Sequence, residues 1–126
     1  LDTAPPSFDV IQGIPTYSLM SLKHGADGLI AGPANVFPEA VSELYAAHQA
    51  GDDAYAWARL SEVILPILRT TRSMPMISAL RYLSANAGRD LGDPLPPLPE
   101  LTNNQREKLD RCYRTVVASE LTAEDD

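Results

Sequence analysis

Hydrophobic and polar positions follow two different periods along the first fifty residues of the chain. Two short apolar runs, residues 8–12 and 28–31, are bounded by glycine and proline, which favours short buried strands. Apolar residues then recur at helical spacing over residues 15–24 and again over residues 38–51. The pattern predicts the order strand, helix, strand, helix.

From residue 51 onward the pattern is helical only. Asp52 and Asp53 suit a helix N-terminus. Pro66 lies inside the apolar pattern that follows and predicts a kink or break there. The next helix is expected to end before Gly88. The two apolar stripes consist of Trp57, Leu60, Ile64, Ile67 and Leu68, and of Met76, Ile77, Leu80 and Leu83.

A proline-rich segment separates these helices from the last one. Residues 93–99 contain four prolines, which exclude a helix and favour a stiff surface strap over a Pro-rich recognition peptide. Thr102 and Gln105 have the spacing of a capping box, so the final amphipathic helix begins there. The acidic residues 124–126 are expected to form a frayed end.

The two predicted strands are too short and too apolar for a half-exposed antiparallel sheet. They fit an α/β fold with a parallel sheet covered by helices. Two parallel strands do not make a stable sheet, and their edges stay open. The chain is therefore expected to be the C-terminal part of a larger α/β fold, unless another chain supplies the remaining strands.

Charge and composition narrow the classes of partner. The chain has 126 residues, a net charge of −7 and a sequence pI of about 4.7. Such an acidic balance argues against nucleic acid and against an anionic membrane surface as partners. Cys112 is the one cysteine of the sequence, so an internal disulfide is excluded, and a cytoplasmic setting fits.

Several residues are candidates for a chemical role. The turn Gly32 to Asn35 has little side-chain bulk, so a ligand can approach its backbone, although such a turn also occurs as a plain connection. His24 is a potential ligand or base, but a place on the last helical turn is favoured. No metal site is expected. For Trp57, Met74 and Met76, core packing is favoured over a ligand groove.

The same residues carry a family resemblance. The stretches concerned are Phe8-Asp9-Val10-Ile11-Gln12-Gly13, Gly25-Ala26-Asp27-Gly28-Leu29-Ile30-Ala31-Gly32-Pro33-Ala34-Asn35-Val36-Phe37-Pro38, Gly51-Asp52, and Gly92-Asp93-Pro94-Leu95-Pro96-Pro97-Leu98 followed by Leu101-Thr102. Over nearly its whole length the chain resembles the C-terminal part of the dihydrodipicolinate synthase and N-acetylneuraminate lyase superfamily. Within that superfamily it looks closest to the 2-keto-3-deoxy sugar acid aldolases.

The resemblance implies a fold and a division of the chain. These enzymes are TIM (β/α)8 barrels, and residues 1–50 would form the last two βα units, with strands seven and eight. Residues 51–126 would form the family's C-terminal helical extension, with the Pro-rich strap at 93–99. The first six strands would precede Leu1.

The resemblance also implies the chemistry. The family forms a Schiff base between a lysine on the sixth strand and a 2-keto acid such as pyruvate, without a further cofactor. That lysine would lie outside this chain, so no catalytic residue is expected here. Lys23 and Lys108 fall on helices outside the barrel by this alignment, and neither is a substitute.

Substrate-binding positions can be transferred one by one. Gly13 matches the glycine that ends strand seven, and Ile30 matches a strand-eight residue whose carbonyl faces the pyruvyl group. Ala31 and Gly32 match small residues at the barrel mouth. Pro15 and Thr16 replace acidic residues of the lyases and synthases, which argues against both of those activities, while Thr16 keeps a hydroxyl for a substrate.

The leading hypothesis is part of a class I (Schiff-base) aldolase or lyase, cytoplasmic and assembled as a homo-oligomer, in this family a homotetramer. Its partners would be a small 2-keto acid and an upstream barrel segment. The alternative is a non-catalytic helical interaction or regulatory fragment. A phosphate or carboxylate binder at the Gly32 turn is a weaker third possibility, because no lysine or arginine lies near that turn in sequence.

Overall fold

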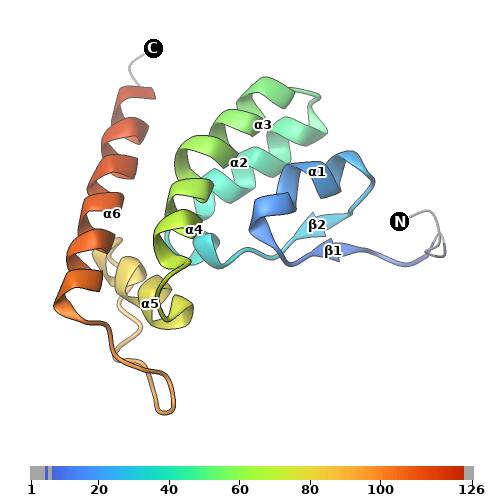
Figure 1. Ribbon diagram of the computed structural model, residues 1–126. Helices are drawn as coiled ribbons and strands as arrows, with labels where there is room; N and C mark the ends of the chain where they lie inside the picture. The colour runs from blue at the N-terminus through green and yellow to red at the C-terminus, as the bar shows by residue number, and fades with distance from the viewer. Residues whose placement is uncertain (1–4, 6, 124–126) are drawn as a thin grey trace. The chain divides into compact units, whose positions relative to one another are not determined.

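The chain divides into two compact units, Leu1–Ile64 and Leu65–Asp126, which are described separately below. The computed structural model describes residue 5 and residues 7–123 (Figure 1). The acidic residues 124–126, for which a frayed end was predicted, lie outside the described residues. The boundary predicted at residue 50, between barrel and extension, concerns a larger fold and stays a prediction.

The first unit is built on a parallel pair of strands. β1 (Ile11–Gln12) pairs with β2 (Gly28–Leu29), with Ile11 opposite Gly28 and Gln12 opposite Leu29. Both strands are shorter than the predicted runs 8–12 and 28–31. Each strand has a single neighbour among the described residues, so only the residues facing that neighbour form a ladder.

Helices connect and follow these strands (Figure 1). A 3-10 turn, η1 (Pro15–Tyr17), leads into α1 (Ser18–Lys23), which crosses back to β2. A second 3-10 turn, η2 (Gly32–Asn35), leads into α2 (Pro38–Gln49). α3 (Asp53–Arg59) and the π-helical segment η3 (Leu60–Ile64) complete the unit. The predicted order of strand, helix, strand, helix is confirmed.

The ends of these helices follow the local signals in the sequence. Gly25 and Gly51 end α1 and α2 with φ angles of +90° and +76°, a region that glycine enters without strain. Asp52 caps α3 through its side chain, whose Oδ1 accepts a hydrogen bond from the backbone N–H of Tyr55 at 3.0 Å. The predicted stops and the predicted cap are therefore confirmed.

The irregularity expected near Pro66 takes the form of a π-helical turn. η3 ends at Ile64, and α4 (Leu65–Thr71) begins at the next residue. Pro66 has no N–H to donate to the carbonyl four residues earlier, and a widened turn is one way in which a helix accommodates that loss. The structure therefore has a π-helical turn before Pro66, and the helix does not break there.

The same π turn explains why Trp57 does not join the core. Leu60, Val63 and Ile64 are buried, whereas Trp57 is 56% exposed, so its predicted place in the apolar stripe is wrong. A π turn holds more residues than an α turn, so positions before it lose the register assumed for a regular helix. The remaining large buried side chains of this unit are Leu19, Leu22, Val36 and Leu44.

Among the described residues of the first unit, one charged side chain is buried. Arg59 of α3 lies with its Nε 2.8 Å from Oε2 of Glu43 on α2, and its guanidinium also stacks over the ring of Tyr55. The Arg59 side chain is only 6% exposed, against 43% for Glu43. The pair joins α2 to α3 and supplies the carboxylate that a buried guanidinium needs.

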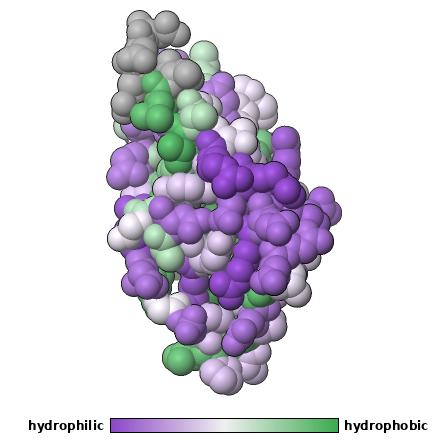
Figure 2. Space-filling view, turned by 90° about the vertical axis from the view of Figure 1, so that its left-hand side faces the viewer, coloured by the Kyte–Doolittle hydropathy of each residue, from purple (hydrophilic) through white to green (hydrophobic). Residues whose placement is uncertain are grey.

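The second unit consists of α4, α5 (Met76–Asn86) and α6 (Asn103–Ala123), which pack against one another. Its core contains Ile67, Leu83, Leu109 and Val116. The surface seen in Figure 2, on the side where α6 lies, is largely hydrophilic, as the polar positions of that helix predict.

Two residues of the second predicted stripe are not in the core. Met76 and Ile77 are exposed, so their predicted burial is wrong. Both lie in the first turn of α5, and the buried face of this helix is centred on Ala79 and Leu83, four residues apart. Ile77 lies on the opposite side of the helix from Ala79 because two residues turn an α-helix by roughly 200°.

The Pro-rich strap has neither helix nor strand over residues 93–99, as predicted. Two residues of α5 fasten it. The Arg81 guanidinium donates to the carbonyls of Leu91, Gly92 and Asp93, and the Ser78 hydroxyl donates to the Pro99 carbonyl at 2.7 Å. The strap is therefore held at both ends by the helix that precedes it.

The predicted capping box at the start of α6 is also present. The backbone N–H of Thr102 donates to Gln105 Oε1 at 2.9 Å, and the backbone N–H of Gln105 donates to Thr102 Oγ1 at 3.3 Å. These two bonds fix the residue at which the chain leaves the strap and becomes helical.

Candidate functional site

The candidate site is the edge of the sheet at which both strands end. Because β1 and β2 are parallel and Gln12 lies opposite Leu29, the next residues, Gly13 and Ile30, leave the sheet side by side. A backbone hydrogen bond of 2.9 Å from the Ile30 N–H to the Gln12 carbonyl continues the pairing up to this edge. Ligands of parallel α/β folds bind at such edges.

Gly13 and Thr16 form the side of this edge that follows β1. Gly13 is exposed, and a Cβ built on it meets no atom within 4 Å, so its backbone is open to a ligand. Thr16 lies in η1 and is exposed. Its hydroxyl makes no hydrogen bond within the described residues, so it keeps a donor and an acceptor for a ligand.

Ile30, Ala31 and Gly32 form the side that follows β2. Ile30 is 70% exposed, whereas Ala31 is buried and Gly32 half-buried. The turn that begins at Gly32 is the 3-10 segment η2, and the Asn35 amide nitrogen donates to the Gly32 carbonyl at 3.0 Å. The turn is thus a fixed piece of backbone, with a large apolar side chain exposed just before it.

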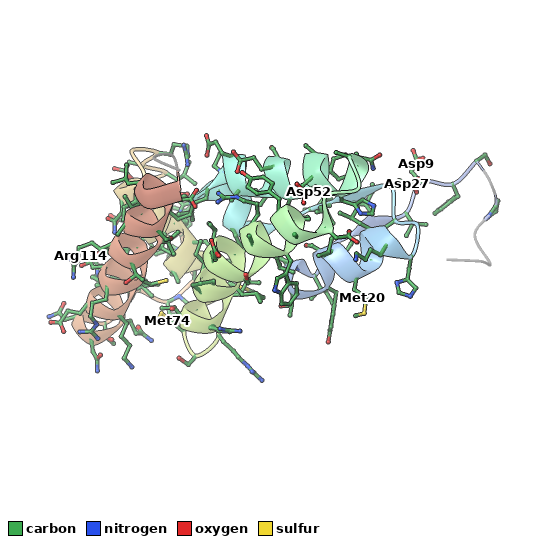
Figure 3. All side chains as sticks on the ribbon, turned by 90° about the horizontal axis from the view of Figure 1, so that it is seen from above. Asp9, Met20, Asp27, Asp52, Met74 and Arg114 are labelled. Atoms are coloured by element: carbon green, nitrogen blue, oxygen red, sulfur yellow. The ribbon has the colours of Figure 1, made fainter. Side chains whose placement is uncertain are left out.

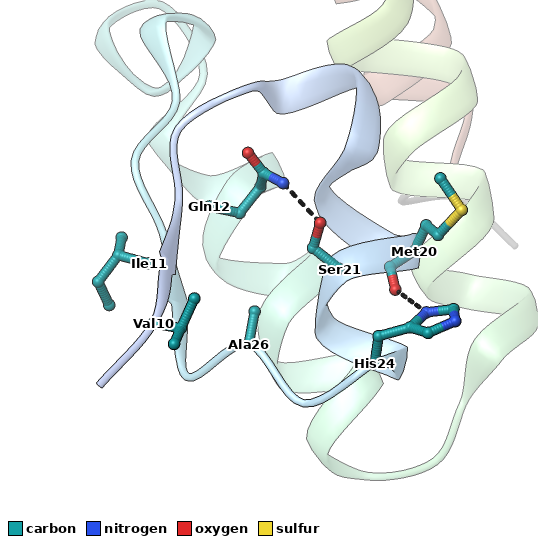
Figure 4. Close-up of a pocket in the computed structure, with 7 residues that line it drawn as sticks. All are labelled: Val10, Ile11, Gln12, Met20, Ser21, His24 and Ala26. Carbon is teal, nitrogen blue, oxygen red and sulfur yellow. Dashed lines mark hydrogen bonds between the residues drawn. The ribbon is translucent and has the colours of Figure 1, made fainter. Parts of the chain in front are cut away.

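The structure adds Gln12, which the sequence reasoning did not select. Its Nε2 donates to Ser21 Oγ on α1 at 2.6 Å (Figure 4). Its Oε1 accepts from the backbone N–H of Ile14 at 2.7 Å. One side chain therefore fixes the loop that contains Gly13 and ties it to α1. A glutamine at the end of an apolar run was the available signal, because a polar residue there needs partners.

The opposite ends of the strands are acidic. The Asp27 carboxylate accepts from the backbone N–H of Val10 at 2.8 Å, and the Tyr45 hydroxyl donates to the Asp27 carbonyl at 3.0 Å. Asp9 and Asp27 appear together at this end in Figure 3. By contrast, residues 13–16 and 30–35 contain no titratable side chain. The candidate edge offers backbone groups and the Thr16 hydroxyl for hydrogen bonds, but these residues supply no titratable acid or base.

A groove of about 390 Å³ runs along the outer side of β1, next to α1. In Figure 4, Val10 and Ala26 point toward α1, whereas Ile11 points to the other side of the strand. His24 closes one end, with its Nδ1 2.8 Å from the Met20 carbonyl, which places the imidazole on the last helical turn as predicted. The groove follows an edge of β1 that pairs with no strand in the described part of the chain.

The two lysines of the sequence belong to different units. Lys23 is at the end of α1, with its Nζ 2.7 Å from Oδ2 of Asp53, and Lys108 is an exposed residue of α6 in the second unit. Over residues 5 and 7–123, no cluster of three or more His, Cys, Asp or Glu side chains is arranged to hold a metal ion.

Tyr82 of α5, in the second unit, has a raised pKa. Burial, together with the hydrogen bond that the Tyr82 hydroxyl donates to Asp110 Oδ1 at 2.9 Å, raises the pKa of Tyr82. The Arg106 guanidinium, which lies 5.4 Å from the ring centroid, opposes that shift. Tyr82 and Asp110 join α5 to α6, so the interaction is structural.

The strand–helix repeat is consistent with part of a TIM barrel, and solved structures of TIM-barrel enzymes match the chain. It superimposes on the sialic acid aldolase of Ruminococcus gnavus with a TM-score of 0.83 and 21% identity, covering 96% of this chain and 41% of that one. A profile of the dihydrodipicolinate synthetase family matches residues 1–115, and the chain belongs to that family.

Two curated relatives bear different names. The chain is 30% identical over 115 residues to the 4-hydroxy-tetrahydrodipicolinate synthase of Methanopyrus kandleri, which covers 88% of this chain and 37% of the relative. It is 31% identical over 113 residues to a probable 5-dehydro-4-deoxyglucarate dehydratase of Bradyrhizobium diazoefficiens, covering 86% and 36%. The chain thus spans little more than a third of these relatives. Within the described residues, no helix has the length and apolarity needed to cross a membrane.

Proposed function

We propose that the chain supplies the last two βα units and the C-terminal helical extension of a class I aldolase or lyase that acts on 2-keto acids or keto-deoxy sugar acids. In this proposal the Schiff-base lysine comes from polypeptide outside this chain. The observation that carries the proposal is the candidate edge itself: Gly13 and Ile30 end two parallel strands side by side, and residues 13–16 and 30–35 contain no titratable side chain. Such an edge suits binding and needs a reactive group from elsewhere.

The uncovered apolar residues of the first unit support the same proposal. Ile11, Ile14 and Ile30 are all exposed, although strands of this kind are normally covered on both faces. In a complete barrel further strands would cover them and would enclose the site. Enclosure is also what the chemistry requires, because an apolar setting lowers the pKa of a lysine and makes its amine nucleophilic.

In this proposal the five residues of the edge bind the substrate. The backbone at Gly13 lets the substrate come close, and the carbonyl of Ile30 faces its keto acid portion. Ala31 and Gly32 leave room at the mouth, and the Thr16 hydroxyl bonds a substrate hydroxyl. Gln12 acts on the substrate indirectly, because it holds the loop that contains Gly13. It is a positioning residue.

The test is reductive trapping. The native preparation is incubated with pyruvate and borohydride, and intact and peptide mass spectra locate any adduct. We expect an adduct on a lysine outside these 126 residues and none on Lys23, whose ammonium is bound by Asp53, or on Lys108. An adduct on either lysine would refute the assignment of the nucleophile. If no polypeptide in the preparation is labelled, the result supports the alternative of a non-catalytic interaction fragment over the enzyme.

Variants then test the edge. Replacing Thr16 with Val removes the hydroxyl and keeps the shape, so we expect a higher KM for a hydroxylated keto acid and little change for pyruvate. Gln49→Ala, an exposed change in the last turn of α2, is the matched control. Equal KM changes for both substrates would contradict the role of Thr16. The homotetramer stays a prediction, which native mass spectrometry of the same preparation checks.

A further inference from the structure

A groove in the second unit is lined by cations and hydroxyl groups. It encloses about 560 Å³ between α4 with the residues that follow it and α6. The residues of its lining that matter here are Arg69, Thr70, Ser73, Lys108, Arg111 and Thr115. No carboxylate lines it, although acidic residues outnumber basic ones by 17 to 10 in the sequence.

The three cations of this groove have no side-chain partner among the described residues. Within the described part of the chain, Arg69, Lys108 and Arg111 make no side-chain hydrogen bond and no ion pair. By contrast, Lys23 and Arg59 of the first unit face carboxylates, as described above. Three like charges around one hollow repel one another, and an anion between them would remove that repulsion.

The hydroxyl groups fit the same kind of ligand. Neither Thr70 nor Ser73 uses its hydroxyl in a hydrogen bond within the described residues. Guanidinium groups bind phosphate or carboxylate oxygens in pairs, an ammonium group adds a point charge, and hydroxyls donate further bonds. The groove therefore offers charge and directed donors together.

We propose that this groove binds a small multivalent oxyanion, one that bears phosphoryl groups or several carboxylates. The net charge of −7 repels a long polyanion, whose charges extend over the whole surface. A small anion responds mainly to nearby charges, because charge is screened over about 8 Å at physiological salt, and the charged residues that line the groove are Arg69, Lys108 and Arg111. The site lies in the second unit and is independent of the keto acid site proposed in the first.

Calorimetric titration of the native preparation with sodium pyrophosphate, at ionic strength held constant with sodium chloride, tests the proposal. We expect saturable binding, weakened about tenfold by Arg69→Gln or by Arg111→Gln, because each removes a charged donor. Arg114→Gln is the matched control: Arg114 is an exposed arginine on the same helix, labelled in Figure 3, and is not among the residues lining the groove. Equal loss in the Arg114→Gln variant would overturn the proposal.

Cys112 provides a local readout. It is half-buried, lines the same groove and is the one cysteine of the sequence. Saturation with pyrophosphate should slow the alkylation of Cys112 by uncharged N-ethylmaleimide, followed by peptide mass spectrometry. An unchanged rate under saturation would place the ligand elsewhere and refute the assignment.

A parallel titration with citrate distinguishes the two ligand classes, since the tighter binder identifies the phosphoryl or the carboxylate type. Binding of neither anion would overturn the proposal. Because the readout is binding and not turnover, its failure is separate from a failure of the proposed aldolase or lyase activity.

Discussion

Removing the carboxylate partner of the buried Arg59 should destabilise the first unit more than removing Arg59 itself. The Arg59 side chain is 6% exposed and that of Glu43 is 43% exposed, with 2.8 Å between Nε and Oε2. Two unit charges about 4 Å apart attract by roughly 1 kcal/mol in water and about 4 kcal/mol at an effective dielectric constant of 20. Because Glu43 is partly solvated, we expect Glu43→Gln to cost about 1–3 kcal/mol.

The asymmetry follows from what each substitution leaves behind. Glu43→Gln leaves a buried guanidinium without its carboxylate, and weakens the bond that the Tyr55 hydroxyl donates to Glu43 at 3.3 Å. Arg59→Met removes the buried charge, fills much of the same space, and leaves a Glu43 that water can reach. We therefore expect Arg59→Met to cost less, about 0–1.5 kcal/mol.

Urea unfolding of the native preparation, followed by far-UV circular dichroism, measures both free energies and that of the double variant. In the double variant the buried guanidinium itself is absent, so the free energy of unfolding should recover above that of Glu43→Gln alone. Should Arg59→Met prove the more damaging single change, packing of the long side chain would dominate and the electrostatic reasoning would be refuted.

Four further predictions can be checked with the same material. Leu44→Ala, at a fully buried position of α2, should cost about 3–5 kcal/mol in the free energy of unfolding. Asp52→Ala removes the α3 cap and should cost about 1 kcal/mol by the same measurement. Arg81→Met releases the strap from its carbonyl contacts, so limited proteolysis should cleave within residues 90–99 faster. Because the pKa of Tyr82 is raised in the fold, its neutral form stabilises the protein below about pH 10. That contribution is lost as the pH rises through the folded pKa, and Asp110→Asn should lower the pKa in a phenolate absorbance titration.

The helix ends and caps could be predicted from the sequence because the residues that form each of them lie within a few positions of one another. Gly25 and Gly51 end helices through their own backbone angles. Asp52 caps through a residue three positions along, and the Thr102–Gln105 box is equally short-range. Each of these features depends on one turn of chain, so residue type and spacing suffice to predict it.

Features that depend on contacts between different elements, or on an irregular helical turn, could not be predicted from the sequence. The two bonds of Gln12 require knowing that α1 packs beside β1. The exposure of Trp57 depends on a π turn that shifts the register of its helix, and no periodicity analysis assumes such a turn. Arg81 fastens the strap ten to twelve residues further along the chain. In each case the outcome depends on an interaction or a turn that a regular helix or strand does not contain.

The candidate edge illustrates how much of a site depends on its surroundings. The register of the parallel pair alone places Gly13 beside Ile30, independently of the rest of the protein. The pairing does not determine the chemistry of the site. Ile30 is 70% exposed here, so a ligand at this edge would be in water, where a lysine amine stays protonated and an imine is hydrolysed. The step from a binding edge to a Schiff-base site therefore requires both a lysine and the walls that exclude water. The uncovered faces of Ile11 and Ile14 are where those walls would pack.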